Sequence, residues 1–297
     1  MAETAVLDGF ELRYELHGEG IPVVYTPGRF DPLESSTIVA EALVPLGYQV
    51  LLWDRPNTGA SGLLFEPDHL LRLWADKLDA LFDHVGFSSA FVAGVPNGLL
   101  ASLHFATWHP TRVSGLVLVG AVNGDPSWWD AIAEATLLEP ARVIEEQGMA
   151  AALALGGGRW GVFDWPGQFQ LAPHKRDQLL AMDPVAAART LRAWSDGYTT
   201  ERVWAGGLTD EQLAGIDAPA IVFSGPGELW AAFPFHGPED ARRLHNALPH
   251  SELVISSEYL GDRWASVLEQ IEQADSYDPL VAALAARIDE FVRSCGG

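Results

Sequence analysis

The fold is decided by residues 89–108, which read SAFVAGVPNGLLASLHFATW. Ser89–Gly94 is an apolar run without polar alternation, which is typical of a strand covered on both faces of a parallel sheet. Leu99–Trp108 predicts a helix that ends before His109-Pro110. The two elements are joined by a very short turn, so this stretch predicts one strand-to-helix unit of an α/β domain.

The same alternation of strands and helices extends along the chain on both sides. Further buried strands are expected at Ile21–Thr26, Tyr48–Asp54, Val113–Gly120, Pro219–Ser224 and Glu252–Ser256. Helices are expected at Ser35–Leu46, His69–Val85, Pro238–Leu248 and Asp278–Arg293. Glu11–His17 alternates enough to predict an early antiparallel strand. This order implies right-handed βαβ units and a mostly parallel sheet with helices on both faces.

One long segment departs from this pattern. From about Asp125 to Gly215 the strand signal disappears, and the residues show helical spacing interrupted by glycine and proline. The segment holds Trp128, Trp129, Trp160, Trp165, Trp194 and Trp204, out of 11 tryptophans in the chain. We therefore predict a core domain at 1–124 and 216–297, with a helical cap at 125–215.

Composition narrows the possible partners. Lys and Arg number 18 against 40 Asp and Glu, which gives a net charge of −22. Nucleic acid and anionic membranes require clustered basic residues, so neither is expected as a partner. Cys295 is the only cysteine, and it permits neither an internal disulfide nor a cysteine zinc site. The first ten residues lack the features of a signal peptide, so a cytoplasmic location is expected. A homodimer is compatible with the sequence.

Three motifs lie at the carboxyl ends of predicted strands, where open parallel sheets bind ligands. They are VYTPGR at 24–29, DRPNTGAS at 54–61 and GVPNG at 94–98. With the order of elements, these motifs resemble those of the α/β-hydrolase superfamily: the oxyanion-hole loop, the D-x-R-G-x-G-x-S turn and the G-x-S-x-G nucleophile elbow. The resemblance covers nearly the whole chain and implies an α/β-hydrolase fold with a helical cap.

The resemblance also places Pro96 where the family carries its nucleophile. Proline has no hydroxyl, thiol or carboxylate, so it cannot form a covalent acyl intermediate. It also fixes φ near −65°, whereas the strained elbow requires positive φ. We therefore expect the turn to be relaxed.

The other triad positions are also altered. The family's general-base histidine follows the last strand, but residues 256–264, SSEYLGDRW, contain no histidine. Glu228 matches the place of the family's acidic residue, although it is equally compatible with a solvated loop carboxylate. With two of three members missing, Ser-His-Asp hydrolysis is not expected.

Of the family's catalytic groups, the oxyanion-hole donors are the ones that this sequence is expected to keep. The resemblance implies backbone donors at Asn97 and at Gly28 or Arg29, and donors of this kind can stabilise an enolate without a nucleophile. The Asn97 amide and the Arg29 charge could assist, while Glu228 or His236 moves a proton. Alternatively, Asn97 caps the following helix and Arg29 pairs with an aspartate. The expected substrate-binding residues are Gly28, Phe30, Pro96, Trp128, Trp129, Trp230 and Trp264.

These observations favour a non-hydrolytic, cofactor-independent enzyme that acts on a carbonyl-bearing, aromatic or polycyclic small molecule. Cyclisation, C–C bond formation or a lyase step in bacterial natural-product biosynthesis would fit such a site. No metal or nucleotide motif is present, so neither cofactor is expected. The alternatives are a catalytically silent ligand-binding protein and a hydrolase with a displaced nucleophile at Ser61, Ser102 or Ser224.

Overall fold

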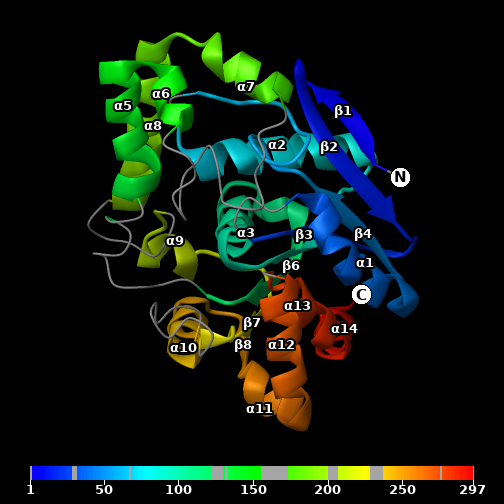
Figure 1. Ribbon diagram of the computed structural model, residues 1–297. Coiled ribbons are helices and arrows are strands. Elements are labelled where there is room, and N and C mark those ends of the chain that lie inside the picture. The colour runs from blue at the N-terminus through cyan, green and yellow to red at the C-terminus, as the bar shows by residue number, and fades with distance from the viewer. Residues whose placement is uncertain are drawn as a thin grey trace.

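The computed structural model describes residues 2–28, 32–66, 68–121, 130, 133–154, 173–199, 207–227, 237–274 and 276–296. In these ranges, strands and helices alternate as the apolar runs predict (Figure 1).

An eight-stranded sheet forms the centre of the molecule, in the order β1-β2-β4-β3-β5-β6-β7-β8. From β4 to β8 all neighbouring strands are parallel, whereas β2 is antiparallel to both β1 and β4. The strands are β1 (Glu3–Leu7), β2 (Phe10–His17), β3 (Ile21–Thr26), β4 (Tyr48–Trp53), β5 (Ala90–Gly94), β6 (Val113–Val119), β7 (Ala220–Phe223) and β8 (Ser251–Val254). The predicted mostly parallel sheet and the antiparallel strand within it are confirmed.

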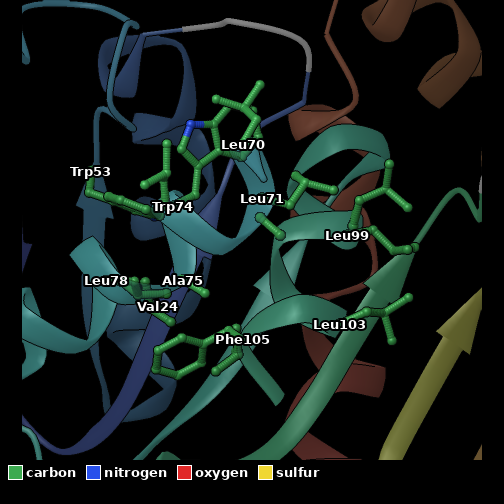
Figure 2. Close-up of a cluster of buried hydrophobic side chains, with 14 of the residues drawn as sticks. Val24, Trp53, Leu70, Leu71, Trp74, Ala75, Leu78, Leu99, Leu103 and Phe105 are labelled. Atoms are coloured by element: carbon green, nitrogen blue, oxygen red, sulfur yellow. The ribbon is translucent and has the colours of Figure 1, made fainter. Parts of the chain in front are cut away.

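Helices cover both faces of this sheet, because successive strand residues point to opposite sides. Val24 of β3 packs in a cluster with α2 (Leu70–Val85) and α3 (Pro96–Trp108), whose apolar side chains meet in Figure 2. Its neighbours Val23 and Tyr25 pack in a second cluster, on the other face. That face carries α1 (Thr37–Leu43), α12 (Trp264–Ala274), α13 (Asp278–Ala283) and α14 (Ala285–Ser294). The short η1 (Leu33–Ser36) and η2 (Val44–Leu46) flank α1, and η3 (Pro110–Arg112) precedes β6.

Helices also fill the connection between β6 and β7, as expected for the insertion (Figure 1). They are the π-helical turn η4 (Glu134–Leu138), α5 (Glu139–Gln147), α6 (Met149–Ala154), α7 (Pro173–Leu180), α8 (Pro184–Thr199) and α9 (Asp210–Ala214). The helix α5 packs on both α6 and α8, whereas α9 contacts α3 and α10 (Pro238–Ala247) of the core. The domain boundaries at 124 and 216 stay predictions. The helix α9 belongs to the predicted cap by its residue numbers, but it packs on helices of the core.

The insertion is tied to the core through the segment that follows β4. The ammonium of Lys175, on α7, donates to the carbonyl oxygens of Gly59 at 2.5 Å and Thr58 at 3.2 Å. On α8, the Trp194 indole N–H donates to the carbonyl of Glu66 at 2.9 Å, and its ring packs 4.7 Å from that of Phe65. Both anchors lie between the end of β4 and the beginning of α2.

The segment after β8 differs from the expected loop. It forms α11 (Ser256–Leu260), the short turn η6 (Gly261–Arg263) and then α12. The predicted final helix is divided at Leu284 into α13 and α14. In Figure 1, α11, α12, α13 and α14 lie together in the lower part of the molecule.

Candidate functional site

The candidate site lies where the chain reverses its direction of travel across the sheet. From β3 the chain moves outward to β4, and it then returns to form β5 on the other side of β3. Ligands of open α/β sheets bind at such a switch point, beyond the carboxyl ends of the strands. Here those ends are followed by Gly28 and by Val95-Pro96. A Cβ placed on Gly28 would lie 3.3 Å from Val95 Cγ2 and 3.8 Å from Pro96 Cδ, so the two loops are in contact.

Two glycines allow this close approach. A Cβ on Gly94 would lie 2.3 Å from the carbonyl carbon and oxygen of Gly98. A Cβ on Gly98 would lie 2.0 Å from the carbonyl oxygen of Thr26, at the end of β3. Any side chain at either position would push the first turn of α3 away from the sheet. The spacing Gly94-x-x-x-Gly98 thus has a direct steric reason.

Pro96 is the first residue of α3, and Val95 is its N-cap, with φ −111° and ψ 161°. Among the described residues other than glycine, only Asp8 and Asn57 have positive φ. The turn between β5 and α3 is therefore unstrained, as the proline ring requires. Proline is favourable at this position because the first helical N–H has no partner within the helix.

Asn97 is the second residue of α3, and its side chain is half-buried, like that of Pro96. The alternative in which Asn97 caps α3 is wrong, because Val95 is the N-cap and no side chain caps this helix. The Asn97 side-chain amide forms no hydrogen bond with the part of the chain that the structure describes. Its donors and acceptor, together with its own N–H in the first turn of α3, are available at the carboxyl edge of the sheet.

A buried cation that the sequence did not single out lies beside the loop after β3. Arg55 is fully buried, and its Nη2 donates to the carbonyl oxygen of Gly28 at 3.1 Å. Its guanidinium packs over the ring of Trp74, 4.6 Å from the centroid. The motif of 54–61 suggested only a structural turn, and no local pattern reveals that its arginine reaches across to Gly28.

The buried turn that carries Arg55 is organised by Asp54. The carboxylate of Asp54 accepts the N–H groups of Leu33 and Ala60, both at 2.7 Å. Burial raises the pKa of Asp54, although these two backbone donors and the charge of Arg13 oppose the shift. The hydrogen bonds of Asp54 therefore stabilise the turn after β4, and this turn positions Arg55.

Several predicted site residues lie outside the described residues. These are Arg29, Phe30, Trp128, Trp129, Glu228, Trp230 and His236. Trp264 is described: it begins α12, is half-buried and packs against the cluster on the α1 face of the sheet. Figure 1 shows the beginning of α12 beside α11, away from the helices of the insertion. The structure therefore brings Gly28 into contact with Pro96, and Asn97 follows directly on the helix. A substrate-binding role for Trp264 stays a prediction.

The three serines considered as displaced nucleophiles all serve the backbone. Ser61 Oγ donates to the carbonyl of Asp54 at 2.6 Å, and Ser102 Oγ donates to that of Gly98 at 2.8 Å. Ser224 Oγ accepts the N–H of Ser256 at 2.9 Å. All three residues are buried. Each of these hydroxyls is therefore engaged with a backbone group.

The region after β8 supplies no imidazole, since the sequence has no histidine beyond His250. Within the described ranges, no group of three or more His, Cys, Asp or Glu residues could hold a metal ion. In the same ranges, no helix is long and apolar enough to cross a bilayer.

Comparison with known proteins agrees with this geometry at the level of the fold. No family model matches the chain. An enol-lactonase from Burkholderia xenovorans superposes with a TM-score of 0.56 and 20% identity, over 91% of this chain and 100% of that one. An α/β hydrolase named MGS-M2, from a deep-sea metagenome, superposes with a TM-score of 0.58 and 17% identity, over 90% of this chain and 95% of that one. The chain has the α/β-hydrolase fold.

Sequence relatives cover less of the chain. RutD of Azorhizobium caulinodans is 32% identical over 109 residues, which are 37% of this chain and 40% of RutD. A 2-hydroxy-6-oxononadienedioate/2-hydroxy-6-oxononatrienedioate hydrolase of Dechloromonas aromatica is 32% identical over 119 residues, 40% of this chain and 39% of that protein. The chain thus matches about two fifths of the length of each relative. Both relatives are named as hydrolases, RutD as a carbamate hydrolase.

Proposed function

We propose that this protein is a non-hydrolytic, cofactor-independent enzyme that binds a carbonyl-bearing, aromatic or polycyclic small molecule above Pro96 and Asn97. The observation that supports this most is the turn between β5 and α3. In this fold the nucleophile stands on that turn, and here the position is taken by a proline at the first position of a helix, with unstrained backbone. Such a site can bind and polarise a substrate, but it cannot form an acyl intermediate there.

The remaining polar groups suit carbonyl chemistry. The Asn97 amide is unused by the described residues and half-buried, and the first-turn N–H groups of α3 give that end of the helix a partial positive charge. Both would stabilise negative charge that develops on a carbonyl oxygen. The Arg55 guanidinium beside Gly28 adds a positive field without contact with solvent. The site thus offers donors and positive charge to a carbonyl oxygen, although the protein as a whole is strongly acidic.

The simplest reaction such a site supports is enolisation, which is a first step of cyclisation, C–C bond formation and lyase chemistry. A base takes the proton on the carbon next to the carbonyl, and we assign this role to Glu228 or His236. The C–H electron pair becomes the new C=C bond, and the carbonyl π pair moves to the oxygen. That oxygen accepts hydrogen bonds from Asn97, and no oxidant or cofactor is needed.

The proposal is tested with 2-tetralone, a bicyclic aromatic ketone that exchanges its α-protons in D2O. We expect the protein to accelerate the loss of the α-proton NMR signals above the buffer rate. Asn97→Ala should lower the acceleration about 10- to 100-fold, because removal of one oxyanion donor costs up to about 10²–10³ in rate. Asn246→Ala, at an exposed position of α10, is the matched control and should have no effect.

The main alternative, a catalytically silent binding protein, gives a different result. It would bind the ketone, seen as line broadening of its aromatic protons, but leave the exchange rate at the buffer value. Binding without exchange would therefore contradict the enzymatic proposal. Exchange that is unchanged by Asn97→Ala would contradict the assignment of the site.

A further inference from the structure

We propose that Tyr277 is a substrate-facing hydrogen-bond donor of this site, and that Asp278 and Tyr25 hold it in position. This inference rests on the proposed function, and it names a donor that lies far in sequence from the elbow motif. Three observations carry it: where the Tyr277 ring lies, what fixes its backbone, and what chemistry a phenol adds beside Pro96.

The first observation is the position of the ring. Gly120 follows β6 with φ +71°, and its N–H donates to the carbonyl of Phe223 at 3.0 Å. A Cβ on Gly120 would lie 3.2 Å from Tyr277 Cε1 and 3.6 Å from both Cγ and Cδ of Pro96. The tyrosine ring and the proline ring therefore lie against the same point, at the carboxyl end of β6. Cε1 is bonded to the carbon that carries the hydroxyl, so the polar end of the ring is near Pro96.

The second observation is the clamp beneath this ring. Tyr277 is the N-cap residue of α13, and Asp278 is the first residue of the helix. The Asp278 side chain is buried, and its Oδ1 accepts the hydroxyl of Tyr25 at 2.5 Å. Tyr25 lies in β3, one residue before Thr26, on the strand that leads into Gly28. The bond therefore ties the beginning of α13 to the strand end that forms the other side of the site.

A buried aspartate needs a reason, because removing a carboxylate from water is costly. Burial raises the pKa of Asp278 to about 6, even though the Tyr25 hydroxyl lowers it. A pair of apolar side chains would join α13 to β3 without this desolvation cost. It would not provide the directional hydrogen bond that fixes the backbone next to Tyr277. The N–H of Asp278 also donates to Ser276 Oγ at 3.2 Å, so the residues on both sides of Tyr277 are held by polar contacts. This arrangement fixes the backbone on both sides of Tyr277, whose ring lies beside Pro96.

The third observation is chemical. A phenol O–H is a strong donor that keeps its proton at neutral pH, and phenols are among the side chains that stabilise oxyanions. Tyr277 is 8% exposed, whereas Pro96 and Asn97 are half-buried. A carbonyl oxygen above Pro96 would thus have Asn97 on the helix side and Tyr277 on the β6 side. The carbonyl oxygen would then accept hydrogen bonds from two sides, whereas the backbone N–H groups of α3 alone would donate from one side.

The experiment uses Prodan, a naphthalene ketone whose emission shifts to the red when its carbonyl accepts hydrogen bonds. Bound to the wild-type protein, Prodan should emit at longer wavelength than in an aprotic apolar solvent. Tyr277→Phe keeps the ring but removes the donor, so the emission should shift to the blue and binding should weaken about 3- to 10-fold. Tyr25→Phe should give a smaller blue shift, because the donor remains but is held less firmly.

Tyr48→Phe is the matched control. Its hydroxyl donates to Asp289 Oδ1 at 2.7 Å, a tyrosine–aspartate bond of the same kind at the beginning of β4, the opposite end of a neighbouring strand. It should leave the emission of bound Prodan unchanged. Binding with equal emission in wild type and Tyr277→Phe would overturn the role of Tyr277 alone. If the wild-type protein does not bind Prodan, the proposed function is contradicted, and the role of Tyr277 with it.

Discussion

At the scale of single residues, Pro96 shows how one side chain changes both chemistry and backbone. Its ring fits the first position of α3, where the missing N–H has no cost and the fixed φ matches the helix. The same ring excludes the positive φ of a strained elbow. The residue thus stabilises the folded protein by limiting the unfolded chain, by roughly 0.5–1 kcal/mol relative to other residues.

Gly98 provides a prediction at this scale. Glycine to alanine inside a helix normally stabilises by about 1 kcal/mol. Here the new Cβ would lie 2.0 Å from the carbonyl oxygen of Thr26. We expect Gly98→Ala to lower the free energy of unfolding by about 2 kcal/mol or more, measured by urea denaturation.

Gly215→Ala is the control for Gly98→Ala. Gly215 has φ −84°, and its Cβ would meet only ordinary contacts of 3.4 Å and longer. Its unfolding free energy should change by no more than about 0.5–1 kcal/mol. A Gly98→Ala protein as stable as Gly215→Ala would show that α3 does not pack as closely on β3 as described.

The pKa of Asp278 gives a second prediction. Burial raises this pKa from 3.8 to about 6 in the folded protein. Between about pH 4 and pH 6 the folded state therefore keeps a proton that the unfolded chain has released, and stability falls as pH rises through this range. Relative to Asp278→Asn, the wild-type protein should lose on the order of 2–3 kcal/mol between these pH values. A difference between the two proteins that does not change with pH would contradict the burial of this carboxylate.

At the scale of elements, the sequence predicted the sheet well and the ends of the chain less well. Buried parallel strands need long apolar runs, and such runs give clear signals at β3 to β7. The strand β1 was missed, although the Asp8-Gly9 turn, with φ of 51° and 77°, is a typical hairpin signal. The helices α11 and α12 were missed, because the resemblance places a loop after the last strand and residues 256–264 were read as that loop.

The contact of α7 with the core gives a prediction for an element. Burial lowers the pKa of Lys175 from 10.5 to about 8, although Asp54 opposes the shift. Above about pH 8 the folded protein has released a proton that the unfolded chain holds until about pH 10, so stability rises with pH. The unfolding free energy of the wild-type protein relative to Lys175→Met should increase by about 3 kcal/mol between pH 8 and the unfolded-state pKa of 10.5. A constant difference would mean that the ammonium stays hydrated and that α7 does not anchor the insertion there.

At the scale of the whole molecule, the site collects residues from distant parts of the chain. Gly28, Pro96 and Gly120 meet at one edge of the sheet because parallel strands end there, and the ring of Tyr277 packs beside them. Local motifs identified Gly28, Pro96 and Asn97, since each lies next to a strand end in sequence. Tyr277 and Arg55 lack such a signal, because their places depend on how α13 and the turn after β4 pack on the sheet. Sequence patterns therefore predicted where the proposed site lies, and only the fold shows which residues from elsewhere in the chain pack beside it.

We propose that this polypeptide has no nucleophile of its own at the switch point. The most direct test is incubation with a fluorophosphonate, which forms a stable adduct with an activated serine, followed by intact mass spectrometry. We predict an unchanged mass for the wild-type protein, and also for Pro96→Ser, because no histidine follows β8 to activate the new hydroxyl. A stoichiometric adduct on any serine of the wild-type protein would contradict the account.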